Sequence, residues 1–272
     1  MVNPVKRARL SNGVKMTEAH KRKRLTHSTA QPRPELGSKG KPRPSGRGVE
    51  RLTIAIDGPS GAGKSTVARF LAKRLGYLYI DTGAMYRAVA LKVKEKFIDL
   101  GDESILYQLA SSLSIVFVPE GEETRILCGE EDVTEAIRLP EISRLASAIS
   151  KKKGVREALV QKQREMGRGG GVVLEGRDIG TVVFPEADVK FYLDAETEER
   201  GRRRFNELVK KGVEVDFKEI LDEVMQRDHN DMHRVHSPLK KADDAVLIDS
   251  THRSVEEVVE EMVCIVKEKL KK

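Results

Sequence analysis

The run Gly58-Pro-Ser-Gly-Ala-Gly-Lys-Ser-Thr66 places glycines, a lysine and hydroxyl side chains within nine residues. Glycines at this spacing let consecutive backbone N–H groups turn inward and come close to phosphate oxygens. The ammonium of Lys64 can neutralise charge on the β- and γ-phosphates, and the hydroxyl of Ser65 can bind Mg²⁺. The run therefore predicts a site for a nucleoside triphosphate.

The residues on either side of this loop have the character that such a site needs. Leu52-Thr-Ile-Ala-Ile-Asp57 is short, apolar and β-branched, which is typical of a buried parallel strand. From Val67 to Leu75 apolar residues recur at helical spacing, and Gly76 is placed to end that helix. Strand, glycine loop and helix together form the complete context of a phosphate-binding loop.

Arginines are the second group of residues that could do chemistry. Arg87 and Arg177 each follow a predicted strand, and Arg227, Asp231 and Arg234 recur at i, i+4 and i+7 on one helix face. Planar guanidinium groups bind phosphate bidentately, so converging arginines indicate two facing phosphate groups. The other candidates are Arg200 and Arg203, although a solvated surface position explains Arg203 equally well.

Phosphoryl transfer to a phosphate monoester fits these residues. Its acceptor oxygen is already an anion and needs no strong general base, and the sequence has no convincing Ser/His/Asp or Cys/His arrangement. Transfer of a phosphoryl group is therefore favoured over a GTPase switch.

Strands and helices alternate along the rest of the chain. We expect strands at 77–80, 172–175, 189–193 and 246–249, a strand pair at 114–118 and 124–128, and helices at 81–96, 134–149, 155–164, 196–210, 216–233 and 254–270. The last helix should begin at a capping box made by Ser254 and Glu257. This alternation predicts a three-layer α/β domain with a parallel sheet.

Charge is distributed unevenly. Residues 1–48 hold 13 Lys or Arg and two acidic residues, whereas the rest holds 37 basic and 41 acidic ones. Residues 1–48 are rich in proline and glycine and poor in apolar runs, so we predict that they form a disordered basic tail. A nucleic-acid-touching arm, an organelle transit peptide and a miscalled start codon are alternatives for it.

Composition excludes several classes. No stretch of eighteen apolar residues exists, so we expect no membrane span. Cys128 and Cys264 are the two cysteines, too few for a disulfide framework or a zinc cluster, which suits a cytoplasmic protein.

Five segments in order, IAIDGPSGAGKST, YIDTGAMYR, EGRDIGTVVFP, RDHNDMHR and SPLKKADDAVLIDST, resemble the bacterial cytidylate kinase family from about residue 52 to 270. The resemblance implies a phosphate-loop kinase fold over 49–272, with an acceptor-binding insert at about 97–165 and a helical lid at about 196–236. It further implies transfer of the γ-phosphoryl group of ATP to CMP or dCMP with Mg²⁺. Separately, we expect a monomer.

The same resemblance assigns site residues by position. The ATP side would be Gly58, Pro59, Ser60, Gly61, Ala62, Gly63, Lys64, Ser65, Thr66 and Arg200, with Ser65 on the metal. The CMP side would be Thr82, Tyr86, Arg87, Ser147, Arg156, Arg177, Asp178, Arg227, Asp231 and Arg234. Among these, Lys64, Arg177 and Arg234 would be catalytic, and Ser147, Arg156 and Asp178 would read the base.

The sequence departs from the family at a few positions. Asn230 and Met232 stand where the family often carries further arginines, and Glu175 stands where aspartate is also common. A kinase for another acceptor (UMP, AMP or shikimate) and a nucleic-acid-binding protein that uses the basic tail are the competing hypotheses.

Overall fold

The central sheet has five parallel strands in the order β2-β6-β1-β7-β8. The computed structural model describes residues 51–121 and 123–271. The strands are β1 (Thr53–Asp57), β2 (Leu78–Asp81), β6 (Val172–Gly176), β7 (Val189–Asp194) and β8 (Val246–Asp249). All five were expected from their apolar runs. Because they are parallel, their carboxyl ends meet at one edge, where ligands bind in such sheets.

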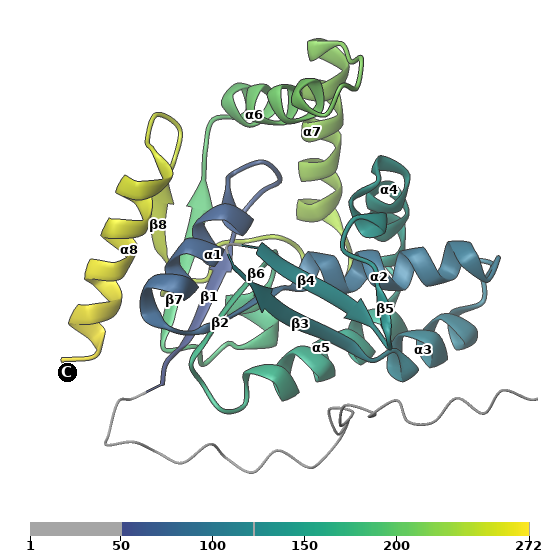
Figure 1. The fold of residues 1–272 in the computed structure, drawn as a ribbon, viewed down its shortest axis with the longest axis horizontal. Helices are drawn as coiled ribbons and strands as arrows, with labels where there is room; N and C mark the ends of the chain where they lie inside the picture. The colour runs from purple at the N-terminus through teal and green to yellow at the C-terminus, as the bar shows by residue number, and fades with distance from the viewer. Residues whose placement is uncertain (1–50, 122, 272) are drawn as a thin grey trace, which may run out of the picture. The chain divides into compact units, whose positions relative to one another are not determined.

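Helices cover both faces of this sheet (Figure 1). Ile54 and Ile56 of β1 pack in one cluster with α1 (Lys64–Leu75) and α8 (Val255–Lys269). Ala55 points to the opposite cluster, which includes α2 (Thr82–Glu95) and α5 (Lys153–Gly167). The alternation of side chains along a strand therefore separates two cores. The three-layer α/β prediction is confirmed.

Helix α8 starts as the sequence predicts. The Ser254 hydroxyl accepts from Glu257 N at 3.2 Å, and the Glu257 carboxylate accepts from Ser254 N at 2.8 Å. This reciprocal pair satisfies two N–H groups that a helix terminus would otherwise leave unpaired.

A second, antiparallel sheet lies in the segment between α2 and β6. Its strands are β3 (Ile115–Glu120), β4 (Glu123–Cys128) and β5 (Glu131–Asp132), in that order. The hairpin of β3 and β4 was expected. Helix α3 (Glu103–Ser112) was not, although Leu106, Leu109 and Ala110 form its buried stripe and Asp102 caps it.

One helix boundary was predicted wrongly. The structure has a 3₁₀ turn at Ala136–Arg138 and then α4 (Pro140–Ile149), in place of one helix over 134–149. Proline disfavours helical backbone at the preceding residue, and Leu139 accordingly has an extended conformation (φ −60°, ψ 139°). The helix therefore begins at Pro140.

Two further helices stand above the carboxyl edge of the sheet in Figure 1: α6 (Thr197–Lys210) and α7 (Phe217–His233). These two helices pack closely on each other. A Cβ added at Gly201 of α6 would lie only 3.0 Å from Cδ1 of Leu221 in α7. After β6 the chain makes a single π-helical turn, Ile179–Val183, which the sequence did not predict. No helix in the described ranges is long and apolar enough to cross a bilayer. The predicted tail, 1–48, lies outside the described residues.

Candidate active site

A cavity of about 800 Å³ opens at the carboxyl edge of the sheet, between the phosphate loop, the insert and helices α6 and α7. Most of the site residues predicted from the sequence line it: Ser60, Gly61, Gly63, Lys64, Ser65, Thr66, Thr82, Tyr86, Arg87, Ser147, Arg156, Arg177, Asp178, Arg227, Asp231 and Arg234. Four predicted residues do not line it: Gly58, Pro59, Ala62 and Arg200. Segments far apart in the sequence thus converge on one space.

The phosphate loop is held tightly against the sheet. A Cβ on Gly58 would lie 1.9 Å from the Leu193 carbonyl oxygen of β7, so only glycine fits there. Gly63 is left-handed (φ 90°) and turns the chain into α1. Lys64 Nζ donates to the Pro59 carbonyl at 2.6 Å, across the loop. Burial and then the nearby Arg177 lower the pKa of Lys64 to about 7.

A carboxylate lies beside the first hydroxyl of α1. Glu175 Oε1 accepts from Ser65 Oγ at 2.5 Å and from Tyr79 OH at 3.1 Å. Burial and then the charge of Asp81 raise the pKa of Glu175. Hydroxyl and carboxylate oxygens are ligands that Mg²⁺ prefers, so this pair fits a magnesium ion that also binds phosphate oxygens. The described part of the chain has no cluster of three or more metal-binding side chains.

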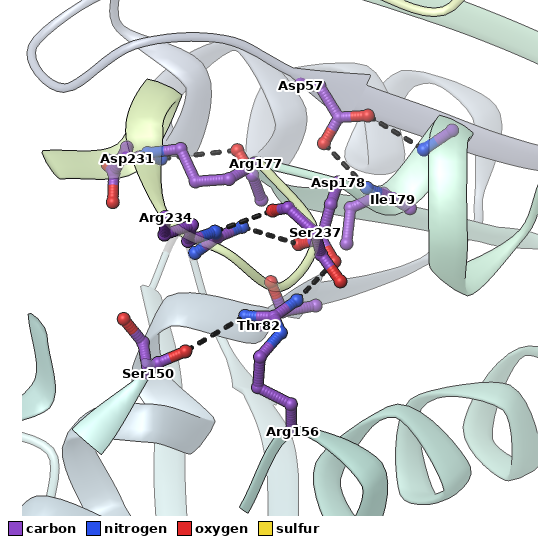
Figure 2. Close-up of polar contacts among 12 residues, drawn as sticks. Asp57, Thr82, Ser150, Arg156, Arg177, Asp178, Ile179, Asp231, Arg234 and Ser237 are labelled. Atoms are coloured by element: carbon purple, nitrogen blue, oxygen red, sulfur yellow. Dashed lines mark hydrogen bonds and ion pairs between the residues drawn. The ribbon is translucent and has the colours of Figure 1, made fainter. Parts of the chain in front are cut away.

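Asp178 joins three parts of the chain, as Figure 2 shows. Its carboxylate accepts hydrogen bonds from Arg156 of α5 and, at 3.3 Å, from Arg234, which ends α7. Arg156 also donates to the Ser150 carbonyl at 3.4 Å, and its guanidinium lies 5.7 Å from the ring centre of Tyr86. The insert, the core and helix α7 therefore meet at one buried carboxylate.

Three further arginines of the predicted site, Arg87, Arg177 and Arg227, line the cavity. Arg177 donates to Asp231 at 2.8 Å, and Arg87 donates to Asp81 at 2.8 Å. The Nε of Arg87 is buried without a hydrogen-bond partner. Burial and then Arg177 lower the pKa of Arg227 to about 10. This concentration of cations, with a donor left unpaired, is suited to an anionic ligand.

Arg200 lies beneath the phosphate loop instead of in the cavity. It is 4% exposed and donates to the carbonyl oxygens of Ser60 (2.9 Å) and Ala195 (2.8 Å) and to the carboxylate of Asp228. Asp228 in turn accepts from Ser60 N at 3.2 Å. Both backbone groups of Ser60 are thus held by one buried ion pair from α6 and α7.

Other cations of α6 do line the cavity. Arg203, Arg204 and Lys211 face it, and only Arg203 was singled out in the sequence. Their recurrence at i, i+1 and i+8 gives a helical face, but the sequence does not say which face is turned to the site. The departures Asn230 and Met232 do not line it, and Asn230 accepts from Lys151 Nζ at 3.2 Å.

A smaller cavity of about 630 Å³ adjoins the outer side of the loop. Gly63, Thr66 and Arg203 line both cavities. The rest of its wall comes from the loop, α1, α6 and the segment from β8 into α8: Ala62, Val67, Glu199, Ser250, Thr251, His252, Arg253, Ser254, Val255 and Val258. Arg203 donates to the carbonyl of Ser250 at 2.5 Å, which closes one side. Sequence reasoning missed this pocket because its walls come from segments far apart in the chain, whose motifs do not show that they meet.

Comparison with known proteins agrees with this geometry. The family model described as "Cytidylate kinase" matches residues 54–268. A cytidylate kinase of Geobacter sulfurreducens is 55% identical over 225 residues, which is 83% of this chain and 97% of the relative. Those of Citrifermentans bemidjiense and Bacillus licheniformis are 54% and 48% identical, over 80% and 82% of this chain and 94% and 99% of theirs. The chain belongs to the cytidylate kinase family.

Proposed function

We propose that this protein transfers the γ-phosphoryl group of ATP to CMP or dCMP, giving ADP and CDP or dCDP. The observation that carries this function is one cavity that joins a phosphate loop to a group of arginines, among which Arg87 has a buried, unpaired Nε. Phosphoryl transfer needs two phosphate groups held in line and their charge neutralised, more than covalent chemistry by the protein.

On the donor side, the loop would hold the triphosphate. The N–H groups of Gly61 and Gly63 and the start of α1 offer donors and a positive helix end, and Lys64 offers a cation. The smaller cavity would take the adenine, which is supported by its sharing Gly63 and Thr66 with the larger one. Arg200 would then act indirectly, by holding the peptide groups of Ser60.

On the acceptor side, Arg87, Arg177 and Arg234 would bind the CMP phosphate, while Thr82 and Tyr86 line the pocket. Arg227 and Asp231 would reach the ribose. The phosphate oxygen of CMP attacks the γ-phosphorus of ATP, the bond to the β-γ bridging oxygen breaks, and no proton need be removed from the acceptor. Arginines around the transferred group stabilise its charge.

The base would be read by Ser147, Arg156 and Asp178. Cytosine offers an amino donor and ring acceptors, which a carboxylate or hydroxyl and a guanidinium can satisfy respectively. Uracil inverts part of that pattern and would leave buried groups unpaired. In support, Arg156 and Asp178 already face each other in the cavity.

Ser65 and Glu175 would hold the magnesium ion, which when bound shields negative charge on the phosphates. Replacing Glu175 with glutamine keeps the shape and removes the charge. We expect the variant to need at least tenfold more Mg²⁺ for half-maximal turnover. The measurement is turnover at increasing Mg²⁺ concentration in buffer free of Ca²⁺. An unchanged requirement would remove Glu175 from the metal site.

Domain roles follow from this function. We propose that about 97–165 binds the acceptor and that about 196–236 closes over both nucleotides, because water in the site would hydrolyse ATP. We further propose a monomer that works in the cytoplasm, with residues 1–48 dispensable for catalysis.

The test is ADP release from Mg·ATP with CMP, dCMP, UMP, AMP, GMP, dTMP and shikimate in turn. The full chain is run beside one that begins at Val49. Turnover confined to CMP and dCMP, equal in both chains, is the expected result. Turnover with UMP at a similar rate would contradict the base-reading residues, and no turnover with any acceptor would overturn the function.

A further inference from the structure

Asp57 is a buried carboxylate for which the proposed reaction has no use. It ends β1, it is 4% exposed, and it is not among the residues that line the larger cavity. Its two oxygens accept from the backbone N–H groups of Ile179 (2.8 Å) and Gly180 (2.7 Å), as Figure 2 shows. A buried charge is costly and needs such compensation.

These two hydrogen bonds hold the first turn of the π-helical segment. The same turn is closed on its other side, where the carbonyl of Asp178 accepts from Val182 N (2.9 Å) and Val183 N (3.1 Å). π-helical turns are rare and occur frequently at functional sites. Asp178 thus lies between the end of β6 and a turn that Asp57 fixes, and this placement directs its side chain toward Arg156 and Arg234.

The turn has little freedom to settle elsewhere. A Cβ on Gly180 would lie 3.1 Å from Lys190 Cδ and 3.4 Å from Asp57 Oδ2. A Cβ on Gly176, just before the turn, would lie 2.7 Å from both Thr82 Oγ1 and Ile179 Cδ1. Close packing on both sides means that a change at Asp57 is transmitted to the turn instead of being absorbed.

We propose that Asp57 is a positioning residue that sets selectivity for the acceptor base, by holding the turn that presents Asp178. This inference rests on the proposed function. Asp57 directly precedes Gly58, but both hydrogen bonds of its carboxylate go to the turn, so a change of its side chain should act on the turn more than on the phosphate loop. Selectivity for cytosine depends on that carboxylate being fixed, because a loose partner can adjust to uracil.

The decisive variant is Asp57→Asn, which keeps the volume. Its amide oxygen can accept one hydrogen bond, but its NH₂ group then faces the second N–H donor. We measure kcat and KM for CMP and UMP, and KM for ATP, at pH 8. The expected result is at least a tenfold fall in the ratio of kcat/KM for CMP to that for UMP, mainly through KM for CMP. The KM for ATP should stay within twofold.

Two further variants keep the test decisive. Val266→Ala removes buried side-chain volume from α8, away from the turn, so it should lower the unfolding temperature and leave the CMP to UMP ratio unchanged. Gly180→Ala adds a Cβ 3.1 Å from Cδ of Lys190, a buried side chain whose Nζ is held by Pro185 O and Asp244. It should therefore displace the turn and lower the ratio even where Asp57→Asn does not fold.

The outcomes separate two claims. If folded Asp57→Asn, or Gly180→Ala in its place, keeps a ratio within threefold of the unmodified chain, Asp57 has no positioning role. If the unmodified chain itself does not prefer CMP to UMP, the proposed base selectivity fails, and the inference about Asp57 fails with it.

Discussion

The buried pair of Arg200 and Asp228 offers a sharp test of how the phosphate loop is held. Asp228→Ala leaves the Arg200 guanidinium buried without its carboxylate and frees the N–H of Ser60. Arg200→Met with Asp228→Leu removes both charges at similar volume. The first variant breaks the pair from one side, whereas the second leaves no charge uncompensated.

The structure sets the size of the effect. Removing one member of a buried ion pair costs about 3–5 kcal/mol of stability. Arg200 would keep hydrogen bonds to Ala195 O (2.8 Å), Ser60 O (2.9 Å) and Thr197 Oγ1 (2.9 Å), so we expect the lower end, about 3 kcal/mol. The double variant should be more stable than the single one, because apolar replacement of a whole pair is often neutral.

The chain contains no tryptophan, so urea unfolding is followed by far-UV circular dichroism, and ATP affinity by calorimetry. If Arg200 acts only through the loop, both variants should weaken ATP binding, and the double variant should weaken it more, because it also loses the hydrogen bond from Arg200 to Ser60 O. If Arg200 binds ATP itself, the loss should appear only where Arg200 is absent. A stability change below 1 kcal/mol in Asp228→Ala would refute the claim that this pair holds the loop.

Three other perturbations follow from single contacts. Gly176→Ala would place a Cβ 2.7 Å from Thr82 Oγ1 and should cost about 1–3 kcal/mol in urea unfolding, whereas Gly169→Ala, with nothing within 4 Å, should be near neutral. Burial, only partly offset by two backbone hydrogen bonds, raises the pKa of Asp57 to about 6, so ionising it costs stability as pH rises from about 4 to about 6. Stability–pH profiles by thermal unfolding should lose that decline in Asp57→Asn, and parallel profiles would contradict the assignment. Ser254→Ala removes the capping box and should lower stability by about 1 kcal/mol, and no loss would show that the cap is redundant.

Local signals made much of the fold predictable. The apolar run ending at Asp57, the glycines after it and the amphipathic helix from Lys64 specify strand, loop and helix by short-range chemistry alone. Arg227, Asp231 and Arg234 all line the cavity, but the i, i+4 and i+7 prediction holds only for the first two, because α7 ends at His233 and Arg234 follows it in an extended conformation (φ −67°, ψ 143°). Period and residue type are sufficient where neighbours in sequence are also neighbours in space.

Other features depend on long-range packing, which no local pattern encodes. The guanidinium of Arg200 suggests phosphate binding, but its surroundings depend on Asp228, 28 residues away. They also depend on the close approach of Gly61, where an added Cβ would lie 3.0 Å from the Cβ of Arg200. The π turn after Asp178 likewise depends on Asp57, more than 120 residues earlier in the chain.

The charged residues of the site fall into two groups, those that follow the neighbouring strands β1 and β6 and those carried by α6 and α7. Lys64 follows β1, and Arg177 and Asp178 follow β6, so their spacing is set by hydrogen bonds between strands about 4.8 Å apart. Arg234 follows α7 and reaches the ends of these strands through its side chain, which donates to Asp178 at 3.3 Å. If residues 196–236 close as proposed, Lys64, Arg177 and Asp178 would keep a fixed spacing, and the distance between the two nucleotides would be set by the sheet. The cations carried by α6 and α7 would then be the ones that change the electrostatic field at the transferred phosphoryl group.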